Sequence, residues 1–233
     1  MKNFIAVCIC VFTLLGCGAD ETPKNTRDVA QDGAQEQAAS AKQAQDAAGV
    51  ALTEAQVFAY VLGREFGLPP YLNTPPRIGE MLDLDAMLQG IVDNESVLKD
   101  TTRELQISFE KQKEIEAHYQ KVAEERKAAG ESAKPIVLAG PIKGGNVILT
   151  ETTAMIIKYS YMQGVQIDLL FDGMRRSFGE DFDYHFFIKG VRESIFSEMD
   201  PSFQKSIPDS TLKAVNNLYK KRVQKMREER RQQ

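Results

Sequence analysis

Apolar residues recur at helical spacing along most of the chain after residue 50, with charged and polar residues between them. The first such apolar face consists of Val57, Tyr60, Val61 and Phe66. Thr53 precedes this face and is followed three residues later by Gln56, which is the pattern of a capping box. The sequence therefore predicts that a helix begins at Thr53.

Gly63 and Gly67 lie inside this first apolar face. Each glycine in a helix interior costs about 1 kcal/mol relative to alanine. One explanation is that a second helix approaches the backbone closely at these positions. The alternative is that Gly63 accommodates a crowded core neighbour and that Gly67 ends the helix as its C-cap. Four prolines follow and predict a non-helical connection over residues 68–76: Pro69, Pro70, Pro75 and Pro76.

Two more helices are predicted in the same stretch. The second begins near Ile78 or Asp83 and ends near Val92, with an apolar face of Met81, Leu84, Met87, Leu88 and Ile91. The third is long and charged, with Asp100 as its predicted cap and Gly130 ending it after Ala129. Its narrow apolar seam consists of Leu105, Phe109, Ile115, Tyr119 and Val122.

A divergent copy of this stretch returns later in the chain. Tyr60, Gly63, Gly90 and Tyr119 have counterparts about 100 residues later in Tyr161, Gly164, Gly190 and Tyr219. Leu52-Thr53-Glu54 similarly corresponds to Leu149-Thr150-Glu151. Helices are predicted from Thr150, over residues 183–195 and from about Ser210. The expected fold is all-α, with two related three-helix units at 49–130 and 150–233, each ending in a long charged helix, and a linker at 131–149.

The N-terminus has the order of an export signal, with Lys2 followed by an apolar run from Phe4 to Leu15. This run is shorter than the roughly 20 residues needed to span a bilayer. Leu14-Leu15-Gly16-Cys17 resembles the lipobox of bacterial lipoproteins, which implies cleavage after residue 16 and acylation of Cys17. A plain secretory signal with a buried cysteine is the alternative. Residues 17–48, which follow the signal at 1–16, predict a disordered tether because they are rich in Ala, Gln and charged residues.

Composition excludes several kinds of chemistry. The formal net charge of −4 gives no reason to expect a nucleic-acid partner. All three cysteines precede residue 18, and the chain has only two histidines, His118 and His185, in different units. Both are expected outside any site. Acidic pairs such as Asp83/Asp85 and Glu180/Asp181 are better explained as helix starts than as metal or acid-base sites. No metal site, cofactor or catalytic residue is predicted.

The repeated unit resembles the N-terminal domain of FKBP-type peptidyl-prolyl cis-trans isomerases of the Mip/FkpA-like group. The resemblance rests on the run from Tyr60 through Gly63 to Gly67, then on Gly90-Ile91 closing a short helix, and then on a long charged helix. It covers residues 52–130, and the second copy departs from it, with Asp168 in place of Gly67. The strand-rich catalytic domain of the family has no counterpart, since Phe171-Asp172-Gly173 and Phe182-Asp183-Tyr184 sit among helical patterns. Prolyl isomerase activity is therefore not expected.

In that family the N-terminal domain forms intertwined homodimers through its first two helices. The resemblance implies a pairing surface that comprises Tyr60, Gly63, Gly67, Met87, Gly90 and Ile91, with Tyr161, Gly164 and Gly190 in the second copy. A homodimer is one possibility. The other is that the two units pair within one chain as a pseudo-dimer, so that a soluble form would be monomeric.

The sequence thus predicts an envelope lipoprotein, lipid-anchored and facing the periplasm from the outer membrane. Its expected role is a non-catalytic, chaperone-like or dimerising module for unfolded envelope proteins. Two alternatives remain, a mixed-dimer scaffold for a full-length FKBP-type isomerase and an active isomerase with an unrecognised site. Basic residues crowd the last helix: Lys220, Lys221, Arg222, Lys225, Arg227, Arg230 and Arg231. They complement the helix dipole or, alternatively, contact anionic lipid or an acidic partner.

Overall fold

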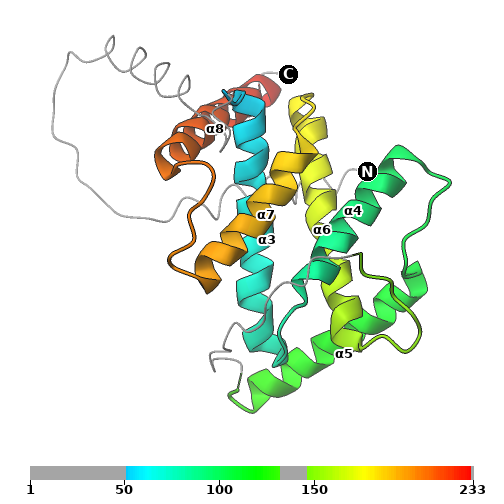
Figure 1. The fold of residues 1–233 in the computed structure, drawn as a ribbon. Helices are drawn as coiled ribbons and strands as arrows, with labels where there is room; N and C mark the ends of the chain where they lie inside the picture. Colours follow the sequence, from blue (N-terminus) through cyan, green and yellow to red (C-terminus); the bar gives the residue numbers. More distant parts are fainter. Residues whose placement is uncertain (1–50, 132–145, 232–233) are drawn as a thin grey trace, which may run out of the picture.

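The computed structural model describes residues 51–131 and 146–231, and within these it contains helices but no strand. The first unit consists of α3 (Glu54–Ile78), α4 (Leu84–Lys99) and α5 (Phe109–Ala128). The second consists of α6 (Met155–Phe178), α7 (Tyr184–Met199) and α8 (Asp209–Arg231). The prediction of an all-α fold with three helices in each repeat is confirmed for these residues (Figure 1).

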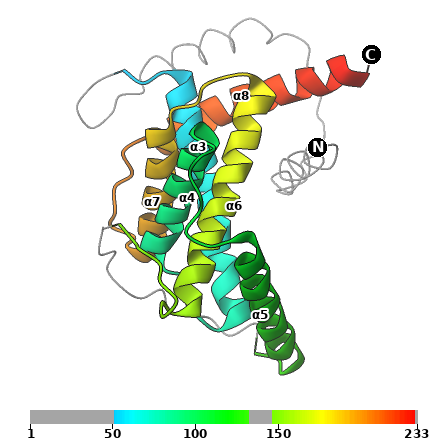
Figure 2. The same cartoon turned by 90° about the vertical axis from the view of Figure 1, so that its right-hand side faces the viewer.

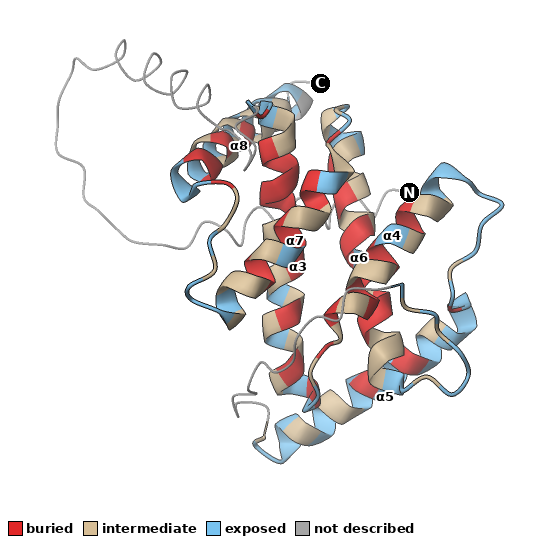
Figure 3. Ribbon diagram, in the orientation of Figure 1, coloured by how far each residue is buried: buried red, intermediate tan, exposed pale blue. Residues whose placement is uncertain are grey.

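The two units are interlocked, because the main helix pairs join one unit to the other. Helix α3 packs along α7, and α4 packs along α6 (Figures 1 and 2). The buried residues of these four helices face one another and form a continuous apolar core (Figure 3). Helices α5 and α8 lie at the periphery, where α5 contacts α3 and α6 and α8 contacts α3. Each unit therefore completes the core of the other.

Helix α3 runs through the proline-rich segment, so the predicted connection at 68–76 is wrong. All four prolines lie inside the helix, which ends only at Gly79 in the left-handed conformation. The Gly79 N–H donates to the carbonyl of Pro75 at 2.8 Å. An interior proline costs about 3 kcal/mol. Burial of Tyr71, Pro75 and Ile78 offsets part of this cost, since full burial of a large apolar side chain contributes about 1.5–3 kcal/mol.

The segment around Asp100 also differs from the prediction. Helix α4 continues past Val92 to Lys99, and Asp100 is the residue that ends it instead of starting the next helix. The Asp100 carboxylate accepts hydrogen bonds from the Thr102 backbone N–H at 3.1 Å and from the Thr102 hydroxyl at 2.7 Å. Helix α5 begins later, with Ser108 as its N-cap. A side chain that binds its own following turn competes with helix initiation, which explains the error.

The peripheral helices confirm some expectations and correct others. In α5 the predicted seam residues Ile115 and Tyr119 are buried, whereas Phe109 is 64% exposed. Helix α5 ends at Ala128, with Gly130 at φ +71°, close to the predicted end. Helix α7 extends to Met199 instead of ending near residue 195. The cause is the same as for α4, since Asp200 closes α7 as Asp100 closes α4.

Several predictions fall outside the described residues. The signal at 1–16, the acylated Cys17, the tether at 17–48 and most of the linker at 131–149 are among them. Within residues 51–131 and 146–231, no helix combines the length and apolarity that crossing a membrane requires.

Candidate functional site

The two helix crossings are built on glycines that press against carbonyl groups of the other unit. A Cβ atom added to Gly63 in α3 would overlap the carbonyl oxygen of Phe187 in α7. Reciprocally, a Cβ at Gly190 in α7 would overlap the carbonyl oxygen of Tyr60. Only glycine permits this approach of two backbones. The close-approach explanation of Gly63 is therefore correct.

The second crossing repeats the same arrangement. A Cβ at Gly90 in α4 would overlap the carbonyl oxygen of Tyr161 in α6, and a Cβ at Gly164 would overlap that of Met87. The α4·α6 crossing thus repeats the α3·α7 crossing, with each helix replaced by its counterpart in the other copy. The repeat explains this relation, because each unit supplies one long first helix and one short second helix.

Gly67 lies deeper in the α3·α7 crossing, one turn beyond Gly63. A Cβ at Gly67 would approach the Cγ1 atom of Val191 to 2.7 Å. The helix continues past this residue, so the prediction of Gly67 as a C-cap is wrong. All nine residues of the expected pairing surface, Ile91 included, are buried where the two units meet.

The repeated tyrosines link each first helix to the other unit. The Tyr60 hydroxyl donates to the Glu193 carboxylate at 2.8 Å, and the Ser206 N–H donates to the same oxygen at 2.8 Å. In the other crossing Tyr161 donates to Asp93 at 2.9 Å and accepts from the Gln106 N–H at 3.1 Å. Burial, followed by the hydrogen bond to Glu193, raises the pKa of Tyr60 far above its ordinary value. Both tyrosines are therefore structural hydrogen-bond donors at physiological pH.

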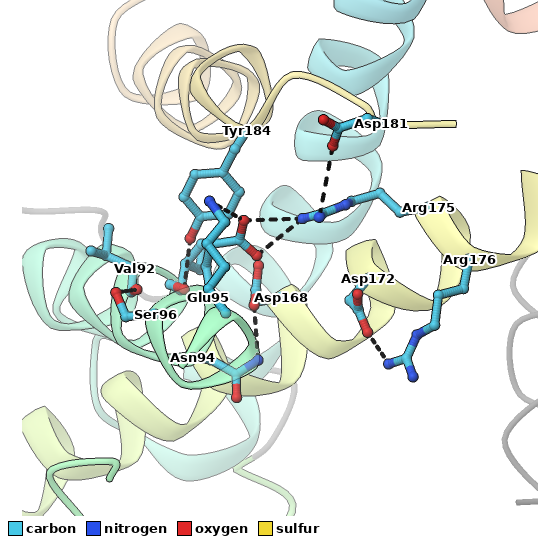
Figure 4. A network of polar contacts seen from close by, with 12 residues as sticks. Val92, Asn94, Glu95, Ser96, Asp168, Asp172, Arg175, Arg176, Asp181 and Tyr184 are labelled. Carbon is cyan, nitrogen blue, oxygen red and sulfur yellow. Dashed lines mark hydrogen bonds and ion pairs between the residues drawn. The ribbon is translucent and has the colours of Figure 1, made fainter. Parts of the chain in front are cut away.

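A buried polar network occupies the α4·α6 crossing alone (Figure 4). Asp168 in α6 is 0% exposed and accepts from the Asn94 side-chain amide at 2.8 Å. Beside it Glu95, 5% exposed, binds Arg175 through both carboxylate oxygens at 3.1 and 3.0 Å. Lys99 adds an ion pair to Glu95 at 2.8 Å. The positions that correspond to Asp168 and Glu95 in the other crossing hold Gly67 and Ile195.

The ionisation of Asp168 is strongly perturbed. Burial is the main cause that raises the pKa of this carboxyl group to about 7; the hydrogen bond from Asn94 opposes the shift, and the nearby charge of Glu95 adds to it. Its Oδ1 atom is buried without a hydrogen-bond partner. The sequence shows Asp168 in the place of a glycine of the first copy, but it does not reveal the polar network around Asp168. The available signal was a set of polar residues at positions where the other crossing is apolar.

A half-open groove of about 360 Å³ lies along the outer face of α7. Its lining consists of His185, Ile188, Lys189, Arg192, Glu193, Phe196 and Phe203. On the corresponding face of α4, the Gln89 side chain accepts a hydrogen bond from the Val147 N–H at 3.3 Å. Gln106 binds the same segment through its side-chain amide, donating to the Val147 carbonyl at 3.0 Å and accepting from the Leu149 N–H at 2.8 Å. Among the described residues, this face of the repeat is thus occupied in the first unit, whereas no segment lies on it in the second.

The remaining candidate residues have structural roles. Asp83 and Asp183 are the N-caps of α4 and α7, as expected for acids at helix starts. His118 and His185 are exposed, and His185 lies in the lining of the groove on α7. Among the described residues no group of three His, Cys, Asp or Glu side chains could hold a metal ion.

Part of the basic charge on α8 is used within the fold. Arg222 binds Glu180 at 2.8 Å and Glu54 at 3.3 Å, and so connects α8 to both units. Glu180 also accepts from the Tyr219 hydroxyl at 2.6 Å. These contacts place Glu180 in the packing of the molecule.

No family model matches this chain, and no curated protein or solved structure matches it either. The resemblance to the FKBP N-terminal domain therefore rests on the residues of the repeat alone.

Proposed function

We propose that this protein is a chaperone-like lipoprotein of the bacterial envelope, in which two FKBP N-terminal-like units pair within one chain. The observation that carries the proposal is the reciprocal contact between glycines and carbonyl groups at the two crossings, formed by residues of the Tyr-x-x-Gly pattern. In the family that this pattern resembles, the same helices pair between two chains. A tandem copy supplies the second partner at a very high effective concentration, which favours pairing within the chain.

The predicted lipid on Cys17 would hold this pseudo-dimer at the outer membrane, facing the periplasm. A tether of about thirty flexible residues has a root-mean-square reach of roughly 30 Å. That length allows the helical body to meet unfolded envelope proteins without detaching from the membrane surface.

The groove on α7 is the surface that we propose for these clients. Its apolar side chains, Ile188, Phe196 and Phe203, are bordered by Lys189 and Arg192. The corresponding face of α4 supports this assignment, because there the segment Val147-Ile148-Leu149 is held by hydrogen bonds with Gln89 and Gln106. An unfolded chain offers such segments, and apolar contacts with a few backbone hydrogen bonds suit weak, non-specific holding.

We propose no catalysis. The segments that could have carried the isomerase signature are helical or lie at a helix start, since Phe171, Asp172 and Gly173 are inside α6 and Tyr184 begins α7. A proline-limited refolding assay tests this point. An accelerated slow phase would support the alternative of an isomerase with an unrecognised site.

The first test is light scattering of an aggregating client with an equimolar amount of the chain from residue 17 onward, carrying Cys17→Ser to prevent acylation. We expect suppressed aggregation, weakened several-fold by Phe203→Ser in the groove. Phe109→Ser is the matched control, because Phe109 is 64% exposed and lies outside the groove. Equal effects of the two substitutions would place the client surface elsewhere.

No suppression by a helical, cooperatively melting protein would contradict the chaperone role. The scaffold alternative would then be tested by coexpression with a full-length FKBP-type isomerase and recovery of a mixed complex. That alternative requires the units to separate first, because the second unit covers Gly63 and Gly90.

A further inference from the structure

The α4·α6 crossing contains a carboxyl group whose surroundings favour its neutral form. Asp168 is 0% exposed, and among the described residues the side chain that donates a hydrogen bond to it is that of Asn94, at 2.8 Å. Within the same residues, its second oxygen, Oδ1, has no partner. A buried ionised carboxylate is costly unless it is paired and fully hydrogen-bonded. Asp168 meets neither condition.

The cations near Asp168 offset its negative charge only in part, because both are ion-paired with Glu95. Helix α4 presents Glu95 and Lys99, and helix α6 presents Arg175. Both cations bind Glu95, Arg175 at 3.0 Å and Lys99 at 2.8 Å. The Tyr184 hydroxyl at the start of α7 is directed elsewhere, since it donates to the Ile91 carbonyl at 2.6 Å. The two cations are thus committed to one buried carboxylate, and a second negative charge would remain without a cation of its own (Figure 4).

We propose that the α4·α6 crossing is a pH-dependent joint, which is tight while Asp168 is protonated and loosens when Asp168 ionises. The α3·α7 crossing has Gly67 and Ile195 at the corresponding positions, so it has no ionisable group there. The molecule would therefore open at one of its two crossings first. This inference does not depend on the client-binding role, because it concerns the folded protein alone.

The direction of the effect follows from proton linkage. The pKa of Asp168 is about 7 in the folded protein, against an ordinary value of 3.8. Between these values the folded protein binds more protons than the unfolded chain, so stability falls as the pH rises. Within this window the unfolding equilibrium constant increases up to about tenfold per pH unit. Below pH 4, where both states are protonated, the contribution is constant.

The test is urea unfolding of the full chain from residue 17, with Cys17→Ser, between pH 5 and pH 8. We expect the wild-type unfolding constant to increase by at least about tenfold over this range. Asp168→Asn, which keeps the shape and removes the charge, should abolish most of this dependence. Asp172→Asn is the matched control, because Asp172 lies one turn away on α6 and is paired with Arg176. An unchanged pH dependence in Asp168→Asn would overturn the proposal.

Two further measurements keep the proposal testable if Asp168→Asn does not fold. Carboxyl carbon chemical shifts of the wild-type protein report the ionisation of Asp168 directly, and a midpoint below pH 5 would overturn the proposal. Amide hydrogen exchange, corrected for intrinsic rates, locates the opening. We expect protection in α4 and α6 to fall up to about tenfold more than in α3 and α7 between pH 6 and pH 8. Equal losses in all four helices would overturn the assignment to one joint.

Discussion

The α3·α7 and α4·α6 crossings share one backbone design but differ in the side chains that surround it. At both, glycines of one unit contact carbonyl oxygens of the other. Next to Gly63 the α3·α7 crossing continues with Gly67 against Val191, which is an apolar contact. Next to Gly164 the α4·α6 crossing continues with Asp168 and the ion pair of Glu95 with Arg175. The helix pairing therefore tolerates either an apolar or an ionic neighbour, provided that the glycines are kept.

The peripheral helices show a second difference between the units. At α8, the peripheral helix of the second unit, Phe58 of α3 stacks on Tyr219 at 3.7 Å between ring centroids, within a cluster that includes Phe178 and Phe182. At α5, the peripheral helix of the first unit, Tyr159 of α6 contacts Tyr119 at 4.3 Å between ring centroids, without the two further rings. Aromatic pairs contribute roughly 0.5–1.5 kcal/mol beyond their buried area. The peripheral helix of the second unit therefore takes part in the larger aromatic cluster of the two.

The largest effect is expected from adding a methyl group where a glycine contacts the facing backbone. Gly63→Ala and Gly164→Ala would each place a methyl group against a carbonyl oxygen of the facing helix, and backbone atoms cannot move aside as side chains do. We expect each to destabilise the protein by about 3 kcal/mol, at the upper end of overpacking effects. Chemical denaturation measures the change. A loss below about 1 kcal/mol at either site would show that the two helices are not as close as the structure places them.

A smaller effect is expected from breaking the ion pair of the α4·α6 crossing. Arg175→Met removes the bidentate partner of Glu95, which is 5% exposed, while Lys99 remains bound. We expect a loss of about 2 kcal/mol, below the 3–5 kcal/mol of a fully buried pair, because Lys99 partly compensates. The control is Arg176→Met on the same helix, whose side chain is 68% exposed, and it should change stability by less than about 0.5 kcal/mol. Similar losses in both variants would contradict a special role for the buried network.

The smallest effect is expected from Gly67→Ala in the apolar crossing. Its new methyl group would meet the Val191 side chain at 2.7 Å, and this side chain can shift. Alanine also favours the helix by about 1 kcal/mol over glycine. The two terms oppose each other, so we expect a net change within about 1 kcal/mol in thermal or urea unfolding. A loss as large as that of Gly63→Ala would show that the α3·α7 crossing is as rigid at Val191 as at Phe187.

The sequence by itself determined the helical class, the repeat and the positions of the close contacts. Thr53 and Gln56 form the predicted capping box, and Gly130 follows the end of the long third helix. These features depend on residues a few positions apart, which local propensity and periodicity describe well. The repeated glycines indicated close packing, because a glycine inside an apolar helical face is costly unless another helix approaches there; the full pairing surface was an expectation from the resemblance to the FKBP N-terminal domain.

Only the tertiary structure decided the other features. Burial of Tyr71 and Ile78 carries α3 through four prolines, and contacts of this kind join residues far apart in the chain. The way in which α4 meets α6 and α3 meets α7 also decides which helices pair, where the groove on α7 lies and which charged groups surround Asp168. Local preferences of a few kcal/mol yield to such burial, and the sequence does not state which surfaces will be buried until the helices have been placed.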